Sequence, residues 1–140
     1  MPITYFQNHV VTITYDENLQ LGAAVWNGFL SSTEFKEASE TCLRLIEDHK
    51  PLRWLGDNRR LRVIRQADQD WFAEHITPRL AASSLRRNAI LLSEDLFNRM
   101  AVDQIVKRAT SLGNMEVMEF DKREEAMAWL LEPIHSLEQG

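Results

Sequence analysis

The chain of 140 residues has the size of one ordinary domain, and its 44% hydrophobic and 26% charged residues exclude a disordered tail protein. Its net charge of −5 and pI of about 5.4 oppose a general nucleic-acid footprint, so we expect no nucleic-acid partner. The longest aliphatic runs are too short to cross a bilayer, no signal peptide is visible, and the single cysteine cannot form an internal disulfide. These features predict a cytoplasmic protein without integral membrane association.

The first part of the chain predicts three strands, one long helix and a fourth strand. Short β-rich stretches at 4–8, 10–15 and 21–28 predict the three strands. Apolar residues at helical spacing follow, and Ser31 with Glu34 matches a capping box, so a helix begins there and ends before Pro51. The segment LRWLGD then predicts a short buried strand that ends at Asp57.

The middle of the chain predicts a helix, a strand and another helix. The helix runs from about Gln66 to Ile76, where Pro78 kinks or ends it. The apolar run NAILLS predicts a strand covered on both faces. The next helix spans 94–113, with an inward stripe of five residues: Phe97, Ala101, Ile105, Ala109 and Leu112.

The last elements are a strand at 115–120 and a helix at 121–132, with Asp121 as its predicted cap. The order β-β-β-α-β-α-β-α-β-α predicts one α/β domain over residues 1–140. We expect a mixed, mostly parallel sheet of about five to six strands with four helices, in which the N-terminal strands pair antiparallel at one edge. Ligands of such sheets bind beyond the carboxyl ends of the strands, an edge that would carry Asn27-Gly28, Asp57 to Arg59, Ser93-Glu94 and Phe120-Asp121.

Six short motifs spread over almost the whole chain carry a family resemblance. They are W-x-G-F at 26–29, S-x-E-F at 32–35, WL-x-D-x-R at 54–59, DQ-x-W at 68–71, PR at 78–79 and A-x-x-WL at 126–130. With this element order, the chain resembles the STAS domain of SpoIIAA-like proteins, the fold of bacterial anti-sigma-factor antagonists. More narrowly, it resembles a bacterial branch of that group labelled SpoIIAA-like or STAS/SEC14-like. The resemblance implies the fold and a non-enzymatic binding or regulatory module, without a particular activity.

One feature of the antagonists is missing from this chain. They carry a phosphorylatable serine or threonine just after the strand that ends in Asp, at the start of the next helix. The matching segment here is DNRRL at 57–61, and neither residue type occurs between Thr41 and Thr77. We therefore expect no phosphorylation switch at this place and no sigma-factor role by that mechanism.

The sequence contains no signature of a metal, a cofactor or a nucleophile. Its histidines form no metal-ligand motif: His9, His49, His75 and His135. Its glycines form no nucleotide-binding loop, so we expect neither a metal nor a cofactor. Cys42 lies on the inward stripe of the first helix, where a small buried core residue is expected rather than a nucleophile.

Positive charge gathers between residues 53 and 87, which hold eight arginines and four acids in a net-acidic chain. One interpretation is an anion site formed by Arg59 and Arg79, because the guanidinium fork binds phosphate or carboxylate bidentately. Trp71 would form its floor, with His75 adding a pH-dependent charge. The other interpretation is internal pairing, in which Asp57 and Asp68 neutralise the arginines.

Three functions remain open at this point. The first is a non-enzymatic module that binds a protein partner or a second copy of itself. The N-terminal strands would be its open sheet edge, where the stretch VVTITY has no lysine or proline to guard it. The second is a carrier or sensor of a small amphipathic or anionic ligand, with an apolar pocket beside the second helix. The third and weakest is a hydrolase that uses Asp68 and His75. The candidate binding residues are Asp57, Arg59, Asp68, Trp71, His75 and Arg79.

Overall fold

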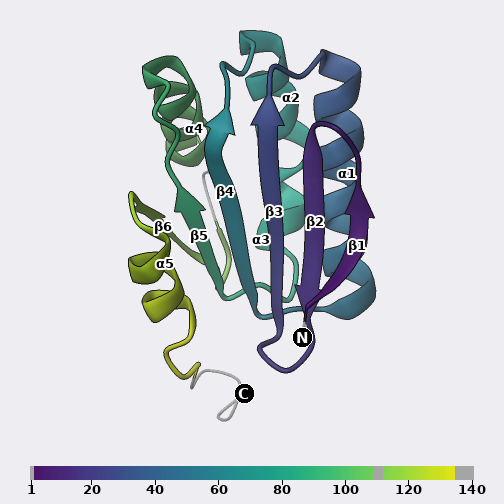
Figure 1. Ribbon diagram of the computed structural model, residues 1–140, viewed down its shortest axis with the longest axis vertical. Coiled ribbons are helices and arrows are strands. Elements are labelled where there is room, and N and C mark those ends of the chain that lie inside the picture. The colour runs from purple at the N-terminus through teal and green to yellow at the C-terminus, as the bar shows by residue number, and fades with distance from the viewer. Residues whose placement is uncertain (1, 109–111, 135–140) are drawn as a thin grey trace.

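The computed structural model describes residues 2–108 and 112–134, which form one six-stranded sheet flanked by helices (Figure 1). The strands are β1 (Ile3–Gln7), β2 (Val11–Asp16), β3 (Leu21–Gly28), β4 (Arg53–Leu61), β5 (Arg87–Leu91) and β6 (Glu116–Phe120). The helices are α1 (Ser32–His49), α2 (Gln66–His75), α3 (Thr77–Ala81), α4 (Leu96–Arg108) and α5 (Arg123–Leu130). The predicted element order is confirmed, with the short α3 as an addition.

The strands lie side by side in chain order, from β1 to β6. The pairs β1–β2 and β2–β3 are antiparallel, whereas β3–β4, β4–β5 and β5–β6 are parallel. This arrangement confirms the predicted mixed, mostly parallel sheet. The prediction that an N-terminal strand forms an open edge is confirmed, since β1 is an edge strand. The unguarded stretch VVTITY is mostly β2, which pairs on both sides.

The two faces of the sheet are covered unequally. Behind the sheet in Figure 1 lie α1 to α4, and they enclose the larger core cluster, which includes Ile13, Leu45 and Trp54. On the other face α5 packs against β4, β5 and β6, where Leu55 and Leu130 belong to a smaller cluster. Among the described residues no helix covers this second face over β1, β2 and β3 (Figure 1). We call this uncovered region the open face.

Strand β4 is longer than the sequence predicted. It continues to Leu61, so the expectation that it ends at Asp57 is wrong. Val25 pairs with Asp57 and Asn27 with Arg60, which leaves two residues of β4 opposite the single residue Trp26. This extra residue is a β-bulge, which shifts the alternation of side chains along the strand. Because of that shift Leu61 is buried in the larger core.

Three predicted helix boundaries have different outcomes. The capping box of α1 is confirmed, since the Glu34 N–H donates to Ser31 Oγ over 3.1 Å and the Ser31 N–H donates to Glu34 Oε1 over 2.8 Å. The break at Pro78 is also confirmed, because α2 ends at His75 and Pro78 lies in the first turn of α3. The predicted Asp121 cap is wrong, since Lys122 is the N-cap of α5 and makes no side-chain bond there.

The apolar stripe of α4 is correct only in part. Ala101 and Ile105 are buried as predicted, whereas Phe97 is 68% exposed. Asn98 takes the inward position instead, because its side-chain amide donates a hydrogen bond of 2.7 Å to the carbonyl of Arg62. Because a polar residue holds this core position, the spacing of apolar residues alone does not show which side of α4 faces the core. Ala109 lies outside the described residues.

Candidate functional site

Asp57 and Arg59 form a compact pair on the open-face side of β4. Arg59 Nη2 donates to Asp57 Oδ2 over 2.7 Å, and Arg59 Nε donates to Asp57 Oδ1 over 3.0 Å. The backbone N–H of Arg59 donates to the same Oδ1 over 3.1 Å. Asp57 is therefore paired with Arg59, as the internal-pairing interpretation predicts for these two residues, and the pair stabilises the bulge on the open-face side of β4.

The electrostatics of this pair favour its charged form. Burial by itself raises the pKa of the Asp57 carboxyl, but the hydrogen bonds from Arg59 and the positive charges of Arg59 and Arg123 outweigh it and hold the pKa below its ordinary value. The hydrogen bond to Asp57 in turn raises the pKa of the Arg59 guanidinium. Asp57 is thus a carboxylate at neutral pH and at moderately acidic pH.

The other predicted residues lie in the helix layer on the opposite side of the sheet. Asp68 has a side chain that is only 4% exposed and lies 3.9 Å from the Arg65 guanidinium. Trp71 has ring contacts with Phe35 and His75 at centroid distances of 6.2 and 5.9 Å. Trp71 is therefore part of the aromatic packing between α1 and α2.

Arg79 does not approach Arg59. It donates to Glu40 over 2.9 Å and to Glu47 over 3.2 Å, so α3 is tied to α1 on the covered side of the sheet. The structure therefore divides the predicted binding residues between two faces and does not assemble them into one site. Internal pairing holds for both arginines, but the partners of Arg79 come from α1 rather than from Asp68.

An apolar cavity of about 140 Å³ lies between the sheet and the covering helices. Its walls come from the helices α1 to α4 and the strands β3 to β6, and include Trp54, Phe72 and Ile105. Gly56 forms part of the sheet-side wall, and a Cβ built there meets only the carbonyl oxygen of Ala89, at 3.9 Å. The space over Gly56 is therefore open, which agrees with the predicted apolar pocket beside the second helix.

The cavity wall carries polar groups without partners. The Ser39 and Thr77 hydroxyls are buried and form no hydrogen bond within the described part of the chain. Cys42 also lines the cavity, and burial raises the pKa of its thiol to about 12, so it is a neutral thiol as expected for a core cysteine. A molecule in this cavity would meet a mainly apolar wall with a few unsatisfied hydrogen-bonding groups.

Comparison with known protein families shows to which family the chain is related. A family model described as SpoIIAA-like matches residues 21–131. The chain belongs to the SpoIIAA-like family. The match includes all elements from β3 to α5, and therefore both the Asp57–Arg59 pair and the cavity. No curated protein and no solved structure gives a significant match.

The described part of this SpoIIAA-like chain has neither a metal-binding cluster nor a membrane-spanning helix. Residues 2–108 and 112–134 contain no group of three or more His, Cys, Asp or Glu side chains that could hold a metal ion. In the same ranges no helix is both long and apolar enough to span a membrane. His135 lies outside the described residues.

Sequence reasoning missed two structural uses of arginine in the SpoIIAA-like fold. Arg53 donates to the carbonyl of Leu19 over 2.8 Å and also bonds the carbonyl of Leu130 at the end of α5. Arg87 donates to the carbonyls of Trp129 and Glu132 over 2.9 and 2.7 Å. These two arginines stand at the amino ends of β4 and β5 and satisfy carbonyls at the helix C-terminus. The one signal for this role was their position close to the start of each predicted strand, LRWLGD and NAILLS.

Proposed function

We propose that this chain is a non-enzymatic binding or regulatory module that takes a small amphipathic ligand into the cavity behind β4 and β5. The observation that carries the proposal is an apolar cavity of about 140 Å³ with unpaired hydroxyls in its wall. A cavity of roughly this size, about 150 Å³, is known to hold a ligand such as benzene. The expected ligand therefore has about six to ten non-hydrogen atoms, most of them apolar.

The polar part of the ligand follows from the two free hydroxyls. A buried hydroxyl without a partner costs about 1–3 kcal/mol relative to one that is hydrogen-bonded. A ligand with one alcohol, ketone or amide group would satisfy Ser39 or Thr77 and recover part of that cost. A pure hydrocarbon would fill the same volume without this gain, so the cavity favours an amphipathic molecule.

Catalysis has little support from the geometry. Asp68 and His75 are seven residues apart on α2, which is about 10 Å along the axis. Asp68 faces Arg65, His75 is exposed, and no hydrogen bond joins the two in the described structure. The segment between β4 and α2 also lacks a hydroxyl side chain, so the proposed module works without the phosphate switch of the antagonists.

The test compares two probes of equal size, cyclohexanol and methylcyclohexane. Methyl NMR of the wild-type protein should show saturable shifts at cavity residues such as Ile46 and Val102, with cyclohexanol binding more tightly. Native mass spectrometry of freshly purified protein tests for a molecule that is already bound. The double variant Ser39→Ala with Thr77→Val should lose the preference for cyclohexanol and still bind methylcyclohexane.

Gly56→Val is the blocking variant, because its side chain would occupy the open space over the strand. It should fold with β-sheet signals like those of the wild type and bind neither probe. The proposal is wrong if neither probe moves the cavity resonances and the purified protein carries no small molecule. It is also wrong if Gly56→Val binds both probes as the wild type does.

A further inference from the structure

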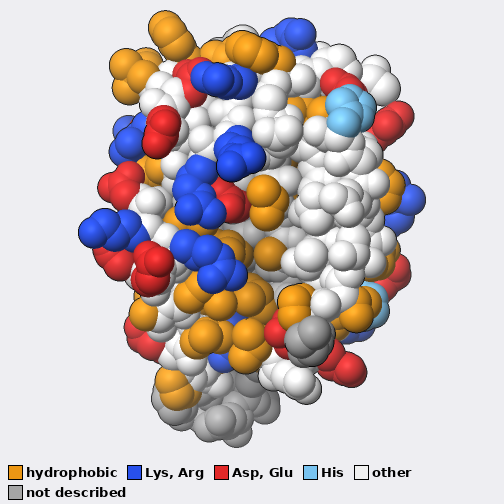
Figure 2. Space-filling view, in the orientation of Figure 1, with side chains coloured by type: hydrophobic (Ala, Val, Ile, Leu, Met, Phe, Trp, Pro, Cys, Tyr) orange, Lys and Arg blue, Asp and Glu red, His pale blue; other side chains and the backbone are white. Residues whose placement is uncertain are grey.

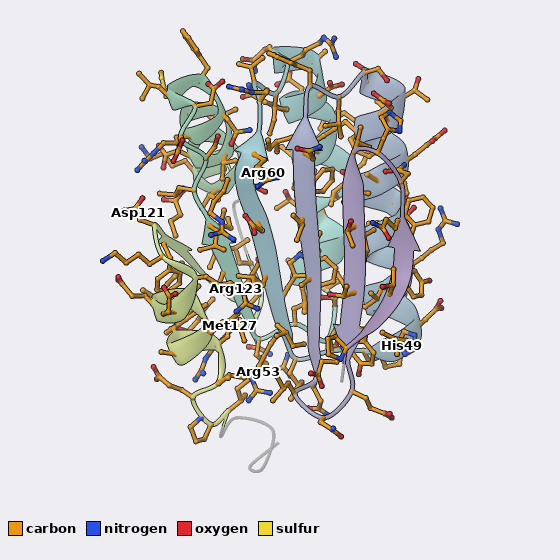
Figure 3. All side chains as sticks on the ribbon, in the orientation of Figure 1. His49, Arg53, Arg60, Asp121, Arg123 and Met127 are labelled. Carbon is orange, nitrogen blue, oxygen red and sulfur yellow. The ribbon has the colours of Figure 1, made fainter. Side chains whose placement is uncertain are left out.

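The open face carries a groove of about 690 Å³ on the side of the sheet opposite to the cavity. We propose that this groove binds a small polar molecule through a phosphate or carboxylate group, held by Arg60 with Arg59 and flanked by Arg123. Figure 3 shows Arg60 on β4 and Arg123 on α5 on the same face of the molecule. The site shares no lining residue with the cavity, so the two proposals can fail separately.

The bulge in β4 creates this arrangement. In a regular strand Arg60 would share a face with Trp54 and Gly56, which line the covered side. The extra residue opposite Trp26 turns Arg60 to the open face, where it lines the groove together with Asp57 and Arg59. Bulges commonly re-aim a side chain at a functional site. The single extra residue of the bulge therefore places two consecutive arginines in the same groove.

The arginines retain the capacity to bind an anion. The guanidinium groups of Arg60 and Arg123 make no hydrogen bond or ion pair with any residue that the structure describes. Arg59 uses Nε and Nη2 for Asp57, which leaves Nη1 without a bond, and its side chain is 46% exposed. Figure 2 shows the basic side chains gathered over β4 and α5, beside a largely uncharged surface over β2 and β3.

Acidic groups near the groove do not occupy these donors. Asp57 already accepts three hydrogen bonds from Arg59. Glu94 lines the groove, and the charge of Glu124 acts on Arg59, yet neither lies within ion-pair distance of Arg60 or Arg123. Both glutamates are exposed, so solvent screens their charge. An anion can therefore contact the free guanidinium groups directly.

The remaining wall indicates the rest of the ligand. Its side chains include the uncharged hydrogen-bonding groups of Gln7, Thr12 and Asn27, and the half-exposed apolar Val25. The two amides and the hydroxyl can form hydrogen bonds with a ligand that is rich in hydroxyl groups, while the arginines can bind a charged group at its end. The groove volume lies in the range of small-molecule sites, which is roughly 300–1,000 Å³. A sugar phosphate or a sugar acid fits this description.

The test uses four probes at constant ionic strength: ribose 5-phosphate, ribonate, inorganic phosphate and ribose. Backbone amide NMR should show saturable shifts along β4, and at Thr12 and Asn27, with ribose 5-phosphate, with ribonate or with both. Comparison of the first two probes identifies phosphate or carboxylate as the recognised group. Ribose alone should bind at least tenfold more weakly than the better charged probe.

The decisive variants are Arg60→Gln and Arg123→Gln, with Arg44→Gln as the matched control. Arg44 is an exposed arginine on α1, so its substitution changes the net charge equally without touching the groove. Arg60→Gln should weaken binding at least tenfold, Arg123→Gln about threefold, and Arg44→Gln not at all. The inference is overturned if no charged probe gives saturable shifts in the millimolar range, or if Arg60→Gln and Arg44→Gln weaken binding equally.

Discussion

At the scale of single residues, the Asp57–Arg59 pair shows how one carboxylate supports a backbone irregularity. A bulge leaves an extra residue outside the regular pattern of the ladder. Asp57 Oδ1 accepts the Arg59 N–H, and both carboxylate oxygens bind the guanidinium. The pair thus holds the chain at the point where the alternation shifts.

This pair predicts a pH-dependent stability. The pKa of Asp57 is lower in the folded protein than its ordinary value of about 3.9, because the interactions with Arg59 outweigh the effect of burial. Its contribution is therefore fully present above about pH 4 and is lost as the pH falls through the folded-state pKa. Asp57→Asn should lower the unfolding free energy by about 1–3 kcal/mol at pH 7. The difference in unfolding free energy between the wild type and Asp57→Asn, measured by urea unfolding, should be smaller at pH 3 than at pH 7. An equal difference at both pH values would contradict the assignment.

Two glycines predict opposite responses to the same substitution. A Cβ at Gly22 would collide with the buried ring of Trp54, whereas a Cβ at Gly56 would enter open space. Gly22→Ala should destabilise the fold by about 1–3 kcal/mol through overpacking. Gly56→Ala should be neutral or stabilise by up to about 1 kcal/mol, since it restricts the unfolded chain. Urea unfolding of the two variants measures the difference, and similar losses in both would argue against the cavity.

At the scale of elements, both apolar packing and polar contacts hold α5 on the sheet. Ala126 and Leu130 are buried against the sheet, but the helix is short and packs only on the smaller core cluster. Arg87 binds its last carbonyls and places its guanidinium 5.7 Å from the centroid of the Trp129 ring. Polar contacts from the strand ends therefore complete the docking of this helix.

Removal of Arg87 should loosen α5 selectively. Arg87→Gln loses the cation–π contact and most of the bonds to the helix end, for an expected cost of about 1–3 kcal/mol. Hydrogen exchange should accelerate in α5 and remain unchanged in α1, which packs on the other face. Arg99→Gln, which alters one exposed ion pair at 3.7 Å, is the control and should have little effect. Uniform acceleration across the whole chain would contradict this role.

At the scale of the whole molecule, the sheet ends in two edge strands, and one of them suits self-association. The edge strand β1 contains no charged residue and no proline, while the opposite edge β6 contains two glutamates. Exposed Ile3 and Phe6 lie on β1. β1 lacks the charges and prolines that guard many edge strands, and its register against β2 shifts between Thr4 and Phe6. We infer that β1 is the edge at which a second copy continues the sheet.

We therefore expect a symmetric dimer through β1 at micromolar concentrations. Sedimentation velocity should show the dimer in the wild type and mainly monomer in Thr4→Lys, because a charge on the edge opposes strand pairing. Met118→Lys places the same charge on the opposite edge and should leave the dimer intact. A wild type that stays monomeric up to about 100 µM would disprove the expectation.

The sequence by itself determined the order of elements, the mixed sheet, the capping box at Ser31 and the resemblance to the SpoIIAA-like family. These features depend on local periodicity, on cap and turn chemistry, and on short motifs, all of which a linear reading contains. The same reading placed Asp57 beside Arg59 correctly, because the two residues are neighbours in the chain. It offered an apolar pocket beside the second helix only as part of one of three open functions, and did not indicate which side chains would line it.

Only the tertiary structure decided which charges meet and which face each side chain takes. Arg79 pairs with Glu40 and Glu47, which lie 39 and 32 residues away in the sequence. No local sequence pattern could therefore show that these glutamates, rather than Asp68, are its partners. The bulge in β4 depends on the register against β3, and it alone moves Arg60 to the open face and Leu61 into the core. The cavity likewise depends on how helices from four parts of the chain pack over Gly56. Packing and register are relations between distant segments, and a linear sequence does not display them.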